Sequence, residues 1–181
     1  MKPSADLLSQ FEEMVGVSDA HFHRISSSDE ILKLADEIAD GAPIWEETAV
    51  WEETAVWEET TEDGDIASNI TSIDHIPGPQ ERTLGVVAAR CGVAETGSVV
   101  LVEETRQQML HSLLSQELLV LVHTEDIIAT MPETATLILE ASSAGKHVTF
   151  LSGPSRTGDI ELRHVSGIQG PCEVHVALCD W

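Results

Sequence analysis

The sequence predicts an α/β fold of a single domain, residues 1–181, with a mainly parallel sheet flanked by helices. Three observations predict this fold class. Runs rich in valine, leucine and isoleucine alternate along the chain with segments whose apolar residues recur at helical spacing. Residues 117–125 contain the unbroken apolar run LLVLV, which is typical of a strand buried on both faces. The length of 181 residues is enough for one domain to bury a sizeable core.

The N-terminal segment is expected to form two helices with a strand between them. Residues 5–16 carry an apolar stripe at helical spacing and end on a glycine. HFHRI at 21–25 is short and extended in character. Residues 26–41 predict a second helix, in which Ser27 and Glu30 form a capping box and the closing glycine marks the end. The expected buried faces are Leu7, Leu8, Phe11, Met14 and Val15 in the first helix, and Ile31, Leu34, Ala35 and Ile38 in the second.

The predicted domain has three parts: N-terminal helices and first strand at 1–44, an acidic repeat and loop region at 45–82, and a core at 83–181. The repeat, WEETAV-WEETAV-WEETTE, begins at Trp45, and its period of six suits neither an amphipathic helix nor an amphipathic strand. Residues 46–65 carry nine acids and no lysine or arginine. We expect a tandem duplication in a mobile surface connection, and the alternative is a tryptophan-bearing binding loop.

Charge and cysteine content exclude several classes of function. A net charge of −23 repels the phosphates of nucleic acids and anionic lipids, so neither is an expected partner. The longest apolar run is far shorter than the roughly 20 residues that span a bilayer, so no membrane insertion is expected. Cys91, Cys172 and Cys179 are odd in number and form no CxxC pair, which argues against disulfides and against a self-contained iron–sulfur or zinc site. We expect a cytoplasmic protein without a cofactor.

The core segment is expected to contain most of the sheet. After a short buried element that begins at Thr83, the sequence predicts strands at 98–104, 117–125, 146–153 and 172–178. A helix is predicted at 126–144, closed by a glycine. Its apolar residues have helical spacing, and its early proline is expected to lie near the start of the continuous part. These residues are Ile127, Ile128, Met131, Ala135, Ile138 and Leu139, and the proline is Pro132.

The loop SGPSRTGDIEL, residues 152–162, follows the predicted strand HVTFL and has the composition of an anion cradle. In open α/β sheets, loops at the carboxyl ends of strands line the ligand crevice. A glycine turn exposes backbone amides, small hydroxyls donate hydrogen bonds, and the arginine fork suits a carboxylate or a phosphate. The alternative is that Arg156 pairs internally with Asp159 or Glu161. The predicted ligand-binding residues are Gly153, Ser155, Arg156, Thr157, Asp159 and Glu161, joined by Thr96 and Gly97 from a second turn.

That second turn, Glu95-Thr96-Gly97, places an acid between two apolar flanks. Such an acid is either a backbone cap, the favoured interpretation, or a poised carboxylate.

Histidines and cysteines give weaker signals. HFH at 21–23 places two imidazoles on one side of a strand, where they could chelate a metal. No third ligand can be assigned from the sequence, so a polar sheet face is favoured and no metal site is expected. His175 is expected to be the outward residue of its strand, and Cys91 a small buried hydrophobe.

Taken together, four stretches resemble the lactate utilization protein C family, whose domain is the LUD domain. They are AETGSVVL, the SLL…LLVLV segment, SGPSRTGDIEL and GIQGPCEVHVAL, and they cover roughly residues 84–181 in the family's order. The GPSRT-DIEL run followed by G-x-x-GP-x-E-x-H is the specific part. Gly158 stands where alanine is common in the family, and Gln169 where histidine is common, which weakens any role for an imidazole at that position.

The resemblance implies a fold like that of the sugar-phosphate isomerase and CoA-transferase group (NagB/RpiA/CoA-transferase-like). It also implies a role in oxidising L-lactate to pyruvate, alongside iron–sulfur and cysteine-rich partner proteins. Because this chain lacks the cysteine spacing of a cluster site, we expect an accessory, non-redox subunit. Such a subunit would bind a small anionic carboxylate or organise the partner complex, and a homo-oligomer is compatible with the sequence.

The resemblance leaves a second hypothesis open, namely an acyl/CoA-transferase-like or sugar-phosphate-isomerase-like enzyme. CoA-transferase relatives use a glutamate on a tight Glu-x-Gly turn as nucleophile, and Glu95 lies on a similar turn. This hypothesis depends on likeness of fold alone. No catalytic partner for Glu95 can be named, so the sequence does not decide whether the protein is an enzyme.

Overall fold

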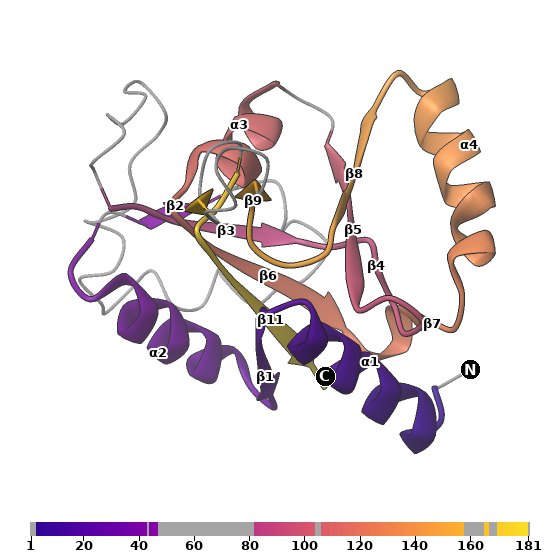
Figure 1. Ribbon diagram of the computed structural model, residues 1–181, viewed down its shortest axis with the longest axis horizontal. Coiled ribbons are helices and arrows are strands. Elements are labelled where there is room, and N and C mark those ends of the chain that lie inside the picture. Colours follow the sequence, from indigo (N-terminus) through magenta and orange to yellow (C-terminus); the bar gives the residue numbers. More distant parts are fainter. Residues whose placement is uncertain are drawn as a thin grey trace.

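The computed structural model describes residues 3–42, 44–46, 82–103, 106–157, 165–166 and 170–180. Within these residues the chain forms a five-stranded sheet (sheet A), a four-stranded sheet (sheet B), a two-stranded ribbon and four α-helices (Figure 1). Most of the WEETAV repeat lies outside the described residues. The expected mobile surface connection and its alternative, a tryptophan-bearing binding loop, therefore stay predictions. No helix in the described part of the chain is long and apolar enough to cross a membrane.

Sheet A is parallel throughout, which confirms the prediction of a mainly parallel sheet. Its strand order is β1-β11-β6-β3-β2 (Figure 1), and every neighbouring pair is parallel. The central strand β6 is buried from its first residue to Val122, as its apolar run predicted. The strands are β1 (His21–Ile25), β2 (Ile44–Glu46), β3 (Leu84–Ala88), β6 (Glu117–His123) and β11 (Glu173–Cys179).

The start of the acidic repeat differs from expectation, because Trp45 and Glu46 belong to strand β2. This strand pairs with β3 at the edge of sheet A, with Trp45 opposite Gly85. Backbone pairing with β3 therefore overrides the unfavourable side-chain period of the repeat at this point.

Sheet B is mixed, and the sequence did not predict it as a separate sheet. Strand β5 runs antiparallel to both β4 and β8, and β7 pairs parallel with β4. The run HVTFL is therefore an edge strand of a mixed sheet and does not belong to the parallel one. The strands, in spatial order, are β7 (Ile127–Ile128), β4 (Cys91–Val93), β5 (Ser98–Glu103) and β8 (His147–Leu151).

The prediction that Ile127 and Ile128 start a helix was wrong, because both lie in β7. Ile127 is buried opposite Gly92, where an added Cβ would lie 2.6 Å from the isoleucine Cδ1 atom. The glycine thus makes room for the side chain, and burial in the core decides the local structure. A 3-10 turn, η3 (Thr124–Asp126), joins β6 to β7.

Two helices cover opposite faces of sheet A. α1 buries Phe11 and Val15 in a core that also includes residues of sheet B, such as Val99. α2 buries Ile31 and Ala35 against the other face. Alternate residues of the three inner strands β3, β6 and β11 belong to the two cores. The helix residues buried in these cores confirm the amphipathic faces predicted for the first two helices. The helices are α1 (Ala5–Val17), α2 (Ser28–Ala39), α3 (Arg106–Leu114) and α4 (Ala135–Ser143).

The capping box predicted at α2 does not form. Ser27 makes no side-chain capping bond, and the Glu30 carboxylate accepts a hydrogen bond from the backbone N–H of Ser26 instead, at 2.8 Å. A complete capping box forms elsewhere, between Thr130 and Glu133, at the 3-10 helix η4 (Met131–Thr134) that precedes α4. Proline and this box fix the helix start close to where the sequence placed it.

Two further differences concern α3 and α4. α3 was not predicted as a helix. In α4, Leu139 is 68% exposed and only Ala141 is fully buried, so the predicted apolar face is wrong in part. α4 lies along the outer side of sheet B (Figure 1), where it contacts β8 and η4. Leu137 of this helix packs against a small apolar cluster of sheet B that contains Cys91 and Val93, so α4 contributes to a side cluster and not to the two main cores.

Candidate functional site

The loop after β8 rests against the turn between α1 and β1. Gly153 has φ +85° and approaches the backbone carbonyl of Ser18 so closely that a Cβ atom would collide with its oxygen. Only glycine adopts this conformation at this distance without strain. The glycine that the sequence singled out therefore fixes the loop to the N-terminal part of the chain.

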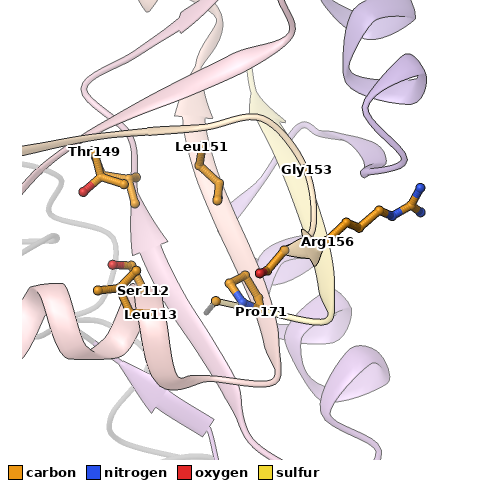
Figure 2. A pocket seen from close by; sticks show the side chains of 10 residues that line it. Ser112, Leu113, Thr149, Leu151, Gly153, Arg156 and Pro171 are labelled. Atoms are coloured by element: carbon orange, nitrogen blue, oxygen red, sulfur yellow. The ribbon is translucent and has the colours of Figure 1, made fainter. Parts of the chain in front are cut away.

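Arg156 continues this contact through an ion pair with Asp19. Both side chains are about half exposed. Figure 2 shows the guanidinium group pointing away from the neighbouring cavity. Asp159 and Glu161, which the sequence offered as internal partners, lie outside the described residues. No sequence pattern pointed to Asp19, because its position next to Arg156 arises only when α1 packs against the sheets.

A cavity of about 260 Å³ lies between α3, sheet B and this loop (Figure 2). Of the predicted binding residues, it brings together Gly153, Ser155 and Arg156. The backbone N–H of Ser155 donates to the carbonyl of Pro171 at 2.9 Å, which ties the loop to the residues before β11. The lining residues are Leu101, Ser112, Leu113, Thr149, Leu151, Gly153, Ser155, Arg156, Gly170 and Pro171.

A buried carboxylate holds two of the hydroxyls that line the cavity. Glu103, 6% exposed, accepts hydrogen bonds from the Ser112 hydroxyl at 2.5 Å and from the Thr149 hydroxyl at 2.9 Å. Because both hydroxyl protons are engaged, these oxygens present only lone pairs to a ligand. This end of the cavity accepts hydrogen bonds, and neither Glu103 nor its two partners were among the predicted site residues.

The second predicted turn is joined to the loop by three hydroxyls. Thr96 Oγ1 lies 2.7 Å from Ser98 Oγ, which lies 2.6 Å from Ser152 Oγ. Gly97 has φ +66° and contacts the backbone at Met14, so the turn also packs on α1. The structure thus brings the two predicted turns together, although Thr96 and Gly97 do not line the cavity.

Glu95 acts as a backbone cap. Its exposed carboxylate accepts a hydrogen bond from the Met131 N–H at 3.0 Å, at the first residue of η4. Among the described residues, Glu95 is not part of the cavity lining. Thr157 lies in the two-residue strand β9 (Arg156–Thr157), which pairs with β10 (Val165–Ser166).

His175 differs from its prediction, because it is 9% exposed and does not face outward. Its ring stacks with the rings of His21 and His23, whose centroids lie 4.7 and 5.3 Å away. Burial lowers the pKa of His175 to about 4 and also lowers the pKa of His23. His175 does lie on the opposite face of β11 from Val174 and Val176, as the alternation predicted, but this face is also covered, because sheet A is buried on both sides.

The thiols are unsuited to redox chemistry or metal binding where they are buried. Burial raises the pKa of Cys91 to about 11 and that of Cys179 to about 12. Their thiolate fraction at neutral pH is therefore very small. Cys91 is a small buried hydrophobe, as predicted, and Cys172 is exposed.

Comparison with known proteins identifies the domain. The family model of the LUD domain matches residues 80–179. Lactate utilization protein C 1 of Bacillus mycoides is 32% identical over 101 residues, which cover 54% of this chain and 43% of the relative. Lactate utilization protein C of Deinococcus radiodurans is 33% identical over 95 residues, covering 51% of this chain and 45% of the relative. The chain thus spans about half the length of the curated relatives that it matches.

The fold is also found in a solved structure. The crystal structure of a DUF162 family protein from Deinococcus radiodurans has a TM-score of 0.67 and 16% sequence identity. The likeness covers 97% of this chain and 97% of the other. It therefore extends to the N-terminal helices, beyond the segment that the family model matches.

Proposed function

The chain belongs to the LUD domain family, and from this premise we propose that it is an accessory, non-redox subunit of an L-lactate oxidation system. Its part is to bind the small carboxylate, L-lactate, in the cavity between α3, sheet B and the loop after β8. The names of the relatives support the lactate system. The observation that carries the binding proposal is the cavity itself, which is small, partly polar and lined on one side by Gly153, Ser155 and Arg156.

The size and polarity of the cavity suit a 2-hydroxy acid. A volume of about 260 Å³ is below the range of about 300–1,000 Å³ that is usual for larger ligands. The Ser112 and Thr149 oxygens, with their protons engaged by Glu103, can accept a hydrogen bond from the lactate hydroxyl. Pyruvate has no hydroxyl to donate, so this end of the cavity favours lactate over its oxidation product.

The carboxylate of the ligand is directed to the loop, where Arg156 is the charged residue of the cavity lining. Its guanidinium points away from the cavity and pairs with Asp19 (Figure 2), so binding requires the side chain to leave Asp19 and turn toward the ligand. An ion pair between half-exposed side chains contributes only about 0–1 kcal/mol, so the exchange of Asp19 for a ligand carboxylate costs little. A planar fork that binds a carboxylate through two hydrogen bonds can compensate for that loss.

Electron transfer falls to the iron–sulfur and cysteine-rich partners. Cys91 and Cys179 are buried with raised pKa values, and they are not adjacent in the sequence to any other cysteine. This chain would then present lactate to the partners or organise their complex. Because the matched segment covers only 43% of the Bacillus mycoides relative, the partner contacts of the whole complex are part of the same proposal.

Calorimetry with the full chain tests the binding step. We expect L-lactate to bind the wild type, pyruvate to bind more weakly, and Arg156→Ala to lose at least tenfold in affinity for lactate. Arg24→Ala is the matched control, because Arg24 pairs with Glu12 at similar exposure on a different part of the surface. Equal binding by the wild type and Arg156→Ala, or binding by neither, would refute the proposal.

A further inference from the structure

We propose that His21, Glu173 and His175 form a binding site for a divalent metal ion of the zinc class on the α2 side of sheet A. One ligand atom from each residue lies within 4.8 Å of the ligand atoms of the other two. Two imidazoles and a carboxylate are ligands that zinc accepts in open sites. The site is separate from the cavity and does not depend on the proposed function.

The strand register brings these side chains together. His21 on β1 is directly opposite His175 on β11, and Glu173 lies two residues before His175 on the same face. Alternate residues of β11 on this face, Ala177 and Cys179, belong to the core beneath α2. The sequence pointed to the two imidazoles of β1, but only His21 belongs to this site, and the neighbouring strand β11 supplies the other two ligands.

An unsatisfied nitrogen gives the independent indication of a ligand. His175 is 9% exposed, and its Nε2 atom is buried without a hydrogen-bond partner in the described part of the chain. This atom lies 4.0 Å from the Glu173 carboxylate. A buried polar atom without a partner is costly for a folded protein, and a coordinated metal ion would supply that partner.

His23 holds the ring of His175 in the orientation that coordination needs. His23 Nε2 lies 3.1 Å from His175 Nδ1. If the proton is on Nδ1 of His175, that nitrogen donates to His23, and the lone pair of Nε2 is available for a metal. Metal-binding histidines usually donate their other nitrogen to a neighbouring acceptor in this way.

The present distances suit a site that closes around its ion. Zinc bonds of about 2.0–2.2 Å place ligand atoms closer together than 4.0–4.8 Å, so the ligands must approach one another. His21 and Glu173 are exposed and can rotate, whereas the buried ring of His175 is held by its neighbours. The fourth position is left for water or a further ligand.

The test is zinc titration of the chelator-treated full chain by calorimetry, with excess magnesium to occupy the acidic surface. We expect one zinc ion to bind per chain, with at least tenfold weaker binding by His21→Ala and by Glu173→Gln. His147→Ala is the matched control, since this exposed histidine lies on β8 in the other sheet. Its zinc affinity should equal that of the wild type.

A second measurement identifies the coordinating atom. In long-range ¹H–¹⁵N spectra, zinc should shift the resonance of His175 Nε2. The thermal unfolding temperature should rise with zinc in the wild type but not in His21→Ala or Glu173→Gln. No zinc binding in the presence of magnesium would overturn the proposal. So would unchanged affinity in both His21→Ala and Glu173→Gln, because zinc would then be bound elsewhere.

Discussion

Gly153→Ala should destabilise the protein by about 2–4 kcal/mol, because two separate effects act at this residue. The first is backbone strain, since φ is +85° and an L-residue in the left-handed region costs about 1–2 kcal/mol. The second is steric, since the new methyl group would collide with the carbonyl oxygen of Ser18. Backbone atoms cannot rotate away as a flexible side chain can, so the loop itself has to move.

The structure contains controls that separate the two effects. Gly145 has φ +72°, but a Cβ atom added there would meet no other atom within 4 Å, so Gly145→Ala carries the backbone strain alone. We expect it to cost about 1 kcal/mol. Gly16 has neither a left-handed φ nor a neighbour within 4 Å, so Gly16→Ala in α1 should be neutral or slightly stabilising.

Urea unfolding followed by circular dichroism measures these differences. For a domain of this size, each kcal/mol lowers the melting temperature by about 2–4 °C, so Gly153→Ala should melt about 4–16 °C below the wild type. Lactate binding by this variant should also weaken, because the loop that carries Arg156 is displaced. If Gly153→Ala and Gly145→Ala are equally stable, the loop does not rest on Ser18 and the reasoning is wrong.

Three other predictions concern charge, catalysis and thiols. Asp19→Asn should lower stability by less than about 1 kcal/mol. It should also raise lactate affinity up to about fivefold in calorimetry, because the ligand no longer competes with Asp19 for the Arg156 guanidinium. Weaker lactate binding by this variant would contradict the prediction. Glu95→Gln keeps an acceptor oxygen for its capping bond, so stability should change little. Neither this variant nor the wild type should exchange acyl-CoA. Exchange by the wild type that is lost in the variant would support the enzyme hypothesis instead. At pH 8, a maleimide should label only Cys172 in the folded chain, because burial raises the pKa values of Cys91 and Cys179 and keeps both thiols protonated. Labelling of all three cysteines would show that these two thiols are not buried.

Local patterns predicted the elements whose structure depends on local forces. The apolar run of β6 and the helical stripes of α1 and α2 are patterns of buried residues within one element, so a short stretch of sequence is enough to predict them. The structure confirms all three. The pattern failed where a distant contact decides. Ile127 has helical spacing with the residues after it, yet pairing with Gly92 places it in a strand. His175 alternates with valines like a surface residue, yet it is only 9% exposed, because the rings of His21 and His23 on the neighbouring strand stack against it.

The same reason explains how much of the candidate site could be predicted. Gly153, Ser155 and Arg156 lie close together in the sequence, and a composition of glycine, hydroxyl and arginine pointed to them. Glu103 could not be found in this way, because a single acid at the end of an apolar strand has no distinguishing neighbour. Its role depends on Ser112 and Thr149, which reach it from a helix and from another strand.

The N-terminal helix explains why the loops of the matched segment hold their positions. The family model begins at residue 80, yet both predicted turns rest on residues that precede it. Gly97 packs against Met14, and Gly153 against Ser18. α1 and the turn after it are therefore part of the site, and a fragment of residues 80–181 would retain the motif while losing the surface that shapes it. The matched segment supplies the chemical groups, and the N-terminal segment supplies their geometry.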